Sequence, residues 1–113
     1  MNMTRGDTYE FKFQRKNQNK EVIIEKPDKM YFTVKENDEM EDFILQKRLD
    51  DNTISYNEET HYYHITIEPK DTSEWQYGTY YYDIEVITNN KTKTIKKGTL
   101  SITSEITFES NEV

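Results

Sequence analysis

Hydrophobic and polar residues alternate in repeated short runs along the 113-residue chain, and this period of two predicts β-strands with one buried face. The clearest run is "GTYYYDIEVIT" at residues 78–88. The main predicted strands, with the residues expected to face the core, are 8–13 (Tyr9, Phe11, Phe13), 29–35 (Met30, Phe32, Val34), 61–68 (Tyr63, Ile65, Ile67) and 78–88 (Tyr80, Tyr82, Ile84, Val86).

Weaker runs predict further strands between turn signals, and residues 89–91, "NNK", predict a hairpin turn. The "KDTSEW" stretch at 70–75 predicts one helical turn after Pro69, capped by Asp71 or Thr72. Residues 109–113 are expected to form a frayed tail. The shorter predicted strands are 43–49, 53–57, 92–103 (broken or bulged near Gly98) and 105–109 (Ile106 and Phe108 inward).

About seven or eight short strands, with turn signals roughly every 8–12 residues and no long helix, predict an all-β fold. The sequence therefore favours a single antiparallel β-sandwich of the immunoglobulin-like kind, formed by residues 1–113 as one domain. Polar segments at 14–21 and 36–42 are expected to be loops.

Composition decides whether so polar a chain can fold. Leu, Ile, Val and Phe number 23 of 113, near the roughly 20% level below which burial fails to offset chain entropy. Nine Tyr, four Met and one Trp add apolar area that can be buried. Ala is absent, while Val, Ile and Thr together number 29, and β-branched residues favour strands.

Charge and motifs exclude several classes of function. The net charge of −7 opposes binding to nucleic acids and to anionic membranes. No run of apolar residues is long enough to span a bilayer, and no secretory signal is expected at the N-terminus. The chain lacks Cys, so it forms neither disulfides nor thiolate sites, and its redox compartment stays open.

Catalytic and metal-binding residues are not expected. The sequence has neither a nucleophile elbow nor a glycine-rich phosphate loop, so no cofactor is predicted and the protein is expected not to be an enzyme. His61 and His64 would point to opposite faces of a strand, which favours two exposed histidines over a zinc site. The acidic loop 36–42 lacks the calcium-loop pattern, and whether it binds a cation is left open.

The tripeptide Arg5-Gly6-Asp7 invites comparison with cell-adhesion signals. Gly6 can adopt a positive φ, and Asp7 can hydrogen-bond the backbone, so both can turn the chain into the first predicted strand at Thr8. Without disulfides or a signal peptide, this architectural interpretation is favoured over adhesion.

Six segments, in order along nearly the whole chain, form one recognisable pattern. They are "RGDTYEF" (5–11), "FTVK" (32–35), "LQKRLDD" (45–51), "YHITIEPKDTSEWQYGTYYYDIEV" (63–86), "KTIKKGTLSIT" (93–103) and "SEIT" (104–107). This pattern resembles small β-sandwich proteins of phage and prophage structural-gene clusters in Gram-positive bacteria, a group related to the N-terminal domain of phage baseplate upper proteins. The sequence differs at Asn52, where such proteins often have glycine, and in "NQNK", which replaces an Asp-Gly turn.

The resemblance implies a component of the virion, made in the bacterial cytoplasm and located in the tail, the baseplate or the head surface. It would act through contacts with other phage structural proteins, as a homo-oligomer or as repeated copies. The copy number and the position in the particle stay open. The residues expected to make such contacts are Trp75, Tyr77 and Tyr81, with Thr8 and Glu10 in the N-terminal strand.

Two other functions stay open. Aromatic rings on a sandwich face can stack on sugars, and Tyr62 and Tyr81 are the rings expected to point outward, so the protein could be a carbohydrate-binding module for host surface glycans. Its small size and acidity also fit an inhibitor that mimics DNA, although the 15 Lys and Arg residues are interleaved with the acids.

Overall fold

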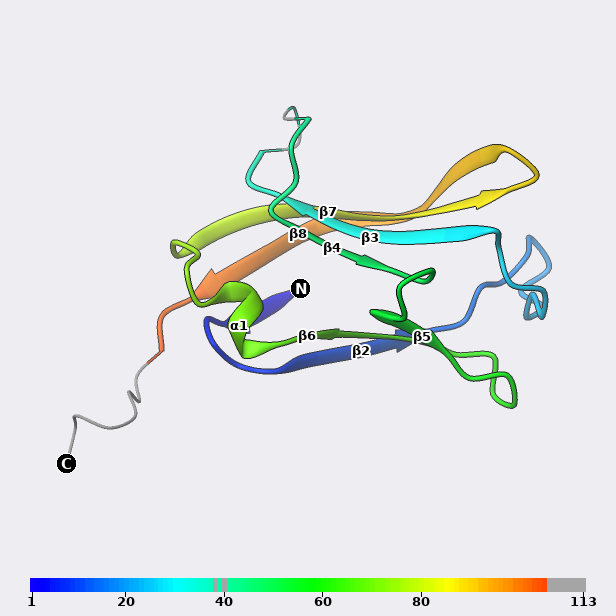
Figure 1. Ribbon diagram of the computed structural model, residues 1–113, viewed down its shortest axis with the longest axis horizontal. Helices are drawn as coiled ribbons and strands as arrows, with labels where there is room; N and C mark the ends of the chain where they lie inside the picture. The colour runs from blue at the N-terminus through cyan, green and yellow to red at the C-terminus, as the bar shows by residue number, and fades with distance from the viewer. Residues whose placement is uncertain (38, 40, 106–113) are drawn as a thin grey trace.

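Two β-sheets face each other in the computed structural model, which describes residues 1–37, 39 and 41–105 (Figure 1). The larger sheet has five strands in the order β1-β8-β7-β3-β4, and the smaller has three in the order β2-β6-β5. The strands are β1 (Asn2–Thr4), β2 (Tyr9–Phe13), β3 (Lys29–Lys35), β4 (Leu45–Arg48), β5 (Ile54–Tyr56), β6 (Tyr63–Ile67), β7 (Gly78–Thr88) and β8 (Lys91–Thr103).

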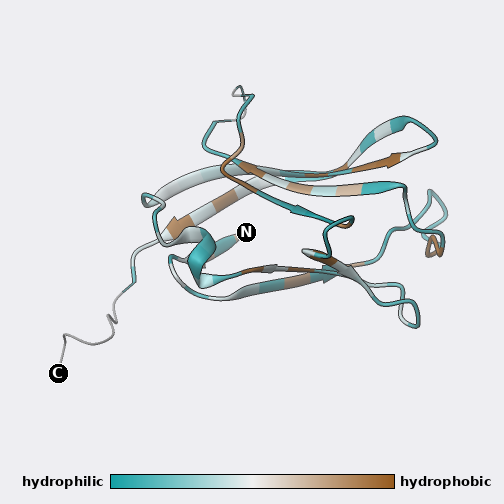
Figure 2. Ribbon diagram, viewed as in Figure 1, coloured by the Kyte–Doolittle hydropathy of each residue, from teal (hydrophilic) through white to brown (hydrophobic). Residues whose placement is uncertain are grey.

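The alternation read from the sequence correctly assigns the buried face of the main strands. Hydrophobic and hydrophilic residues alternate along the ribbon in Figure 2, and on β3, β6 and β7 the predicted inward positions are all buried. The long β7–β8 hairpin forms the middle of the larger sheet and pairs with β3 in antiparallel register. The predicted all-β sandwich is therefore confirmed.

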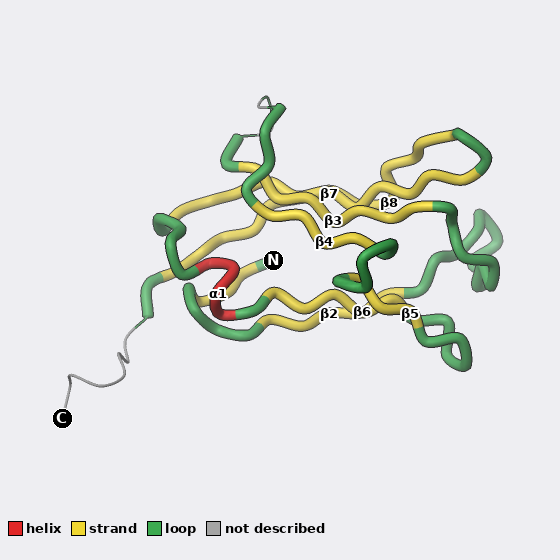
Figure 3. The backbone as a smooth tube through the Cα atoms, in the orientation of Figure 1, coloured by secondary structure: helices red, strands yellow, loops and turns green. Residues whose placement is uncertain are grey.

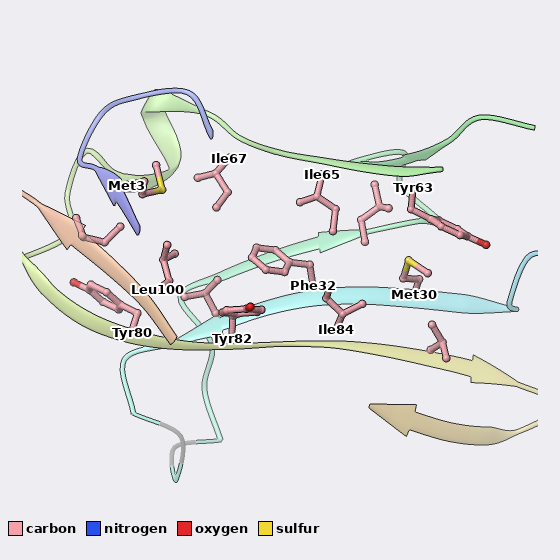
Figure 4. Close-up of a cluster of buried hydrophobic side chains, with 14 residues drawn as sticks. Met3, Met30, Phe32, Tyr63, Ile65, Ile67, Tyr80, Tyr82, Ile84 and Leu100 are labelled. Atoms are coloured by element: carbon pink, nitrogen blue, oxygen red, sulfur yellow. The ribbon is translucent and has the colours of Figure 1, made fainter. Parts of the chain in front are cut away.

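Aromatic rings make contacts between the two sheets, and Figure 4 shows one of them, Phe32, in the core. The Phe32 ring, from β3, lies 5.4 Å from Phe11 of the smaller sheet and 5.7 Å from Tyr82 of its own sheet, measured between ring centroids. Leu100 and Ile65 are fully buried beside them. Large rings therefore supply the apolar area that the few aliphatic residues could not supply alone.

The N-terminal strand β1 was not predicted, and it departs from an entirely antiparallel sandwich. It pairs in parallel with β8, with Met3 opposite Ile102, whereas the other paired strands are antiparallel. A three-residue strand is too short to show alternation, and its pairing depends on residues about one hundred positions away. Local sequence patterns carry no signal for such a contact.

The bulge predicted near Gly98 lies instead at Ile95. Ile84 is opposite Lys96 and Glu85 is opposite Thr94, so Ile95 is the extra residue on β8. Gly98 is in register opposite Tyr82, and a Cβ at Gly98 would lie 3.1 Å from the Tyr82 hydroxyl oxygen. Glycine is therefore present because an aromatic ring packs against the backbone, and not because the strand is broken there.

The helical turn is shorter than predicted and is capped by a different residue. Helix α1 spans Pro69–Thr72, and its N-cap is Glu68, not Asp71 or Thr72. Pro69 occupies the first turn, where a missing N–H costs nothing, and Asp71 reaches back to accept a 2.7 Å hydrogen bond from the Glu68 N–H. Figure 3 shows α1 at one end of the two sheets.

Two other findings complete the comparison with the sequence. Within the described residues, no helix is both long and apolar enough to cross a membrane. The predicted strand at 105–109 and tail at 109–113 lie outside the described residues, except for Glu105.

The Arg5-Gly6-Asp7 segment carries the chain from β1 in the larger sheet to β2 in the smaller one. The Asp7 N–H donates to the Thr4 carbonyl oxygen (3.1 Å), which closes a tight turn, and Gly6 has a φ of +83°. The Gly6 N–H donates to the Thr72 hydroxyl at 2.9 Å. The expected positive φ at Gly6 is thus confirmed, and the turn is bonded to α1.

We expect Thr72→Val to lower the free energy of unfolding by about 1–3 kcal/mol, because it leaves the Gly6 N–H without its acceptor while the side-chain volume is nearly unchanged. Urea denaturation measures the change. Thr79→Val, at an exposed position on β7, is the matched control and should change stability little. Equal stability of the two variants would show that the Gly6–Thr72 bond contributes nothing.

Candidate interaction surfaces

The five residues predicted to contact a partner lie at three separate places. Thr8 and Glu10 are exposed at the smaller sheet, and Tyr81 is exposed on the outer face of the larger sheet. Trp75 and Tyr77 belong to the segment between α1 and β7. The structure therefore does not join them into one surface.

Trp75 has a packing role that limits its availability to a partner. Its ring is half-buried and lies 4.9 Å from Tyr80, and its carbonyl oxygen accepts a 3.2 Å hydrogen bond from Arg5 Nη1. Tyr77 is 49% exposed, but the Arg5 guanidinium lies over its ring at 4.5 Å. Arg5 also donates to Glu105, so its guanidinium is held by several groups at once.

Tyr81 borders a shallow hollow on the outer face of the larger sheet. The hollow has a volume of about 320 Å³, and Tyr81 is 36% exposed. Burial raises the pKa of the Asp83 carboxyl there, while the ammonium groups of Lys35 and Lys97 act in the opposite direction. A ring beside hydroxyl, carboxyl and ammonium groups can bind polar ligands. The other described residues that line the hollow are Thr33, Lys35, Tyr82, Asp83, Lys97, Gly98 and Thr99.

The outer face of the smaller sheet is broader, and most of the residues that line its hollow are polar. Its hollow has a volume of about 730 Å³, and Glu10 is part of its lining. The Lys12 ammonium covers the Tyr62 ring at 4.6 Å, so Tyr62, expected to be a free outward ring, is half-buried. Thr66 and His64 continue this polar face on β6. Such a wide, shallow surface suits a protein better than a small molecule.

A third depression was missed from the sequence. It has a volume of about 250 Å³ and is lined by residues of the β7–β8 hairpin and of the loop that follows β2. Figure 1 shows this hairpin and this loop at the same end of the molecule. Four cationic side chains line it: Arg15, Lys16, Lys93 and Lys96. The basic residues of β8 were visible in the sequence, but the displaced bulge and the folding of a distant loop decide where their side chains lie.

Tyr63 lies beside this region and has an unusual polar environment. Its side chain is fully buried, stacks on Phe13 at 5.5 Å, and has no hydrogen-bond partner for its hydroxyl among the described residues. Burial raises the pKa of the Tyr63 phenol, and the guanidinium of Arg15 acts in the opposite direction. The positive charge that acts on the buried Tyr63 hydroxyl is therefore that of Arg15.

The two histidines are not the exposed pair that the sequence predicted. His61 lies outside the strand, has a φ of +63°, is half-buried, and has its Nδ1 2.7 Å from the Tyr56 hydroxyl. His64 is exposed on the outer face of β6. In the part of the chain that the structure describes, no group of three His, Asp or Glu side chains is arranged to hold a metal ion.

Comparison with protein-family models and with curated proteins gives no match for this chain.

The raised pKa of Asp83 predicts how its replacement changes stability with pH. The folded state binds the proton more tightly than the unfolded state, whose pKa is near 3.8, so Asp83 costs stability as the pH rises through the folded-state pKa. Asp83→Asn removes this cost. We expect the variant and the natural chain to melt alike at low pH, with the variant increasingly more stable as the pH rises and then constant.

Thermal melting at several pH values measures this difference. Asp42→Asn, in the exposed loop before β4, removes the same charge from another place and serves as the control. A gap between Asp83→Asn and the natural chain that shrinks as the pH rises would contradict the role of burial.

Proposed function

We propose that this protein is a non-enzymatic structural component of a phage or prophage particle, in its tail, baseplate or head surface, and that it works through protein–protein contacts. The observation that carries the proposal is that segments of the phage resemblance, far apart in the sequence, bond to one another at one end of the sandwich. These segments are "RGDTYEF", "PKDTSEW" and "SEIT".

Each segment contributes a defined bond. Arg5 Nη2 donates to Glu105 Oε1 at 3.2 Å, which ties the first segment to the last. Gly6 donates to Thr72, and Arg5 donates to the Trp75 carbonyl oxygen, which tie the first segment to the middle one. The resemblance therefore falls on residues that hold this fold together. Because these residues maintain the fold, the resemblance supports a fold in common with the phage β-sandwich proteins. A common fold in turn supports a common role in particle assembly.

The exterior of the molecule supports the same proposal. Both outer sheet faces are shallow and polar, and the larger hollow covers three strands of the smaller sheet. Structural positions in particles are repeated by symmetry, so a small rigid unit with several separate faces can contact more than one neighbour. We propose other phage structural proteins and further copies of this chain as the partners, with the virion as the location.

The test is detection of the protein in purified particles, followed by substitution of exposed residues. Tyr81 and Glu10 lie on different outer faces. We expect the substitution on the face that makes the contact, either Tyr81→Ala or Glu10→Lys, to lower incorporation of the protein into particles by about tenfold or more, corresponding to about 1–2 kcal/mol of contact energy. Thr79→Ala, which is exposed beside Tyr81 on β7, is the control.

Trp75 is a poor choice for this test, because its replacement would disturb packing against Tyr80. Melting temperatures of Tyr81→Ala and Glu10→Lys should stay close to that of the natural chain. Absence of the protein from purified particles would overturn the proposal.

A specific observation favours carbohydrate binding as a second candidate. The exposed Tyr81 ring stands beside Asp83 and Thr99 in the hollow of the larger sheet, and an aromatic ring next to hydrogen-bonding groups is the chemistry that recognises sugars. A glycan array with the isolated protein tests it. Binding that is lost in Tyr81→Ala and kept in Tyr77→Ala would support this function.

A further inference from the structure

The cleft at the hairpin end concentrates positive charge in a protein of net charge −7. Among the described residues, its four cations (Arg15, Lys16, Lys93 and Lys96) form no ion pair, and no acidic residue lines the cleft. Glu21 and Glu25 belong to the same loop but are not part of the lining. Like charges brought together raise the free energy of the isolated molecule, so this arrangement favours an anionic occupant.

The bulge at Ile95 places two of these cations on the same face. In a regular strand, residues three apart point to opposite faces. Here Lys93 is opposite Val86 and Lys96 is opposite Ile84, and both partners face the core side of β7. The extra residue therefore turns Lys93 and Lys96 toward the same side of the sheet, where the cleft lies.

The loop after β2 supplies the opposite wall. A bridge between Lys16 and Val22 folds this loop back on itself, and the Ile23 N–H donates to the Arg15 carbonyl oxygen at 2.8 Å. Arg15 Nη1 donates to the Glu25 carbonyl oxygen at 3.0 Å, which fixes the guanidinium. Half-buried Phe13, Ile23 and Ile95 form an apolar lining beneath the charges. The occupant should therefore combine acidic and apolar side chains.

The chain itself presents such a segment at the far end of β3. Glu41 and Asp42 are exposed, and they precede Phe43 and Ile44, which are 47% and 36% exposed. Ile44 is anchored by a 2.9 Å hydrogen bond from its N–H to the Val34 carbonyl oxygen. Two exposed apolar side chains directly after two carboxylates match the cleft in both charge and polarity.

The two surfaces cannot meet within one molecule. The cleft adjoins Val86, which pairs with Met30 at the beginning of β3, whereas Ile44 lies beside the end of β3. β3 is a seven-residue extended strand, so it holds the two surfaces apart. We propose that the segment Glu41–Ile44 of one copy docks into the Arg15/Lys16/Lys93/Lys96 cleft of a second copy, head to tail.

This contact uses two different surfaces, so it propagates from copy to copy and gives a ring or a row. It rests on the proposed function, since it identifies one of the neighbours as a further copy of the chain. Exposed charge pairs are weak in water, so the isolated chain should associate weakly, with dissociation constants of about 10 μM to 1 mM. Repetition in a particle would strengthen the same contact through avidity.

Sedimentation velocity of the isolated chain up to about 1 mM tests the inference at low salt. The natural chain should form oligomers that dissociate as salt screens the charges. Lys93→Glu with Lys96→Glu should be monomeric, because the acidic segment then meets a cleft in which the two introduced carboxylates cancel the charges of Arg15 and Lys16. Glu41→Lys with Asp42→Lys should also be monomeric, because a basic segment then meets the basic cleft. An equimolar mixture of these two variants should associate, because the acidic segment of the first variant meets the unchanged basic cleft of the second.

Lys12→Glu with Lys70→Glu changes the charge by the same amount at exposed positions on the smaller sheet and on α1, and it should associate like the natural chain. A natural chain that stays monomeric at about 1 mM, or variant mixtures that fail to restore association, would overturn the inference. Neither result bears on whether the protein is found in particles, so the proposed function is judged separately by purified particles.

The absence of cysteine permits a direct test of the geometry. Ile44→Cys mixed with Gln14→Cys, which lies in the lining of the cleft, should give a disulfide-linked dimer under mild oxidation. Ile44→Cys mixed with Thr66→Cys, on the outer face of the smaller sheet, is the control and should not. Equal cross-linking in both mixtures would contradict the proposed docking.

Discussion

The turn at Gly6 is the constraint on which the arrangement of the two sheets depends. The chain crosses between the sheets there, from β1 to β2, and crosses again through α1, between β6 and β7. The hydrogen bond from Gly6 to Thr72 joins these two crossings directly. A φ of +83° is open to glycine, whereas a side chain there would cost about 1–2 kcal/mol. The turn at Gly6 thus ties together two of the connections by which the chain passes between the sheets.

Polar side chains of β4 and α1 also stabilise the end of the sandwich near α1. Lys47 of β4 lies 2.7 Å from Asp71 of α1, and their side chains are only 10% and 12% exposed. The same Asp71 oxygen accepts the Glu68 N–H, so the desolvated charges are well satisfied. The end near α1 is therefore consolidated by internal bonds. The four cations of the cleft, which form no ion pair among the described residues, lie at the hairpin end, so the proposed docking site is separate from these stabilising bonds.

The sequence predicted the strands whose two faces differ strongly, because alternation reports directly which side is buried. Thus Met30 and Tyr82 were placed correctly. The sequence does not predict the conformation of segments whose structure depends on contacts with residues elsewhere in the fold. β1 exists because β8 is beside it, and Trp75 is half-buried because Tyr80 lies against it. The sequence predicts a break or bulge near Gly98, because glycine is the local signal for irregularity. In the structure, Gly98 is instead the residue against which the Tyr82 ring packs.

The lysines and the bulge on β8 also limit how a second copy of the chain could pair with this strand. Beyond the residues covered by β1, β8 has an open edge, and both features oppose the in-register addition of a strand there. Edge protection explains Lys93 and Lys96, but it does not explain why Arg15 and Lys16 are folded toward them from another loop. The docking proposed above would therefore depend on side chains and not on backbone pairing at this edge. A contact made through specific side chains would fix one register and one direction, which is what a symmetric array of copies would need.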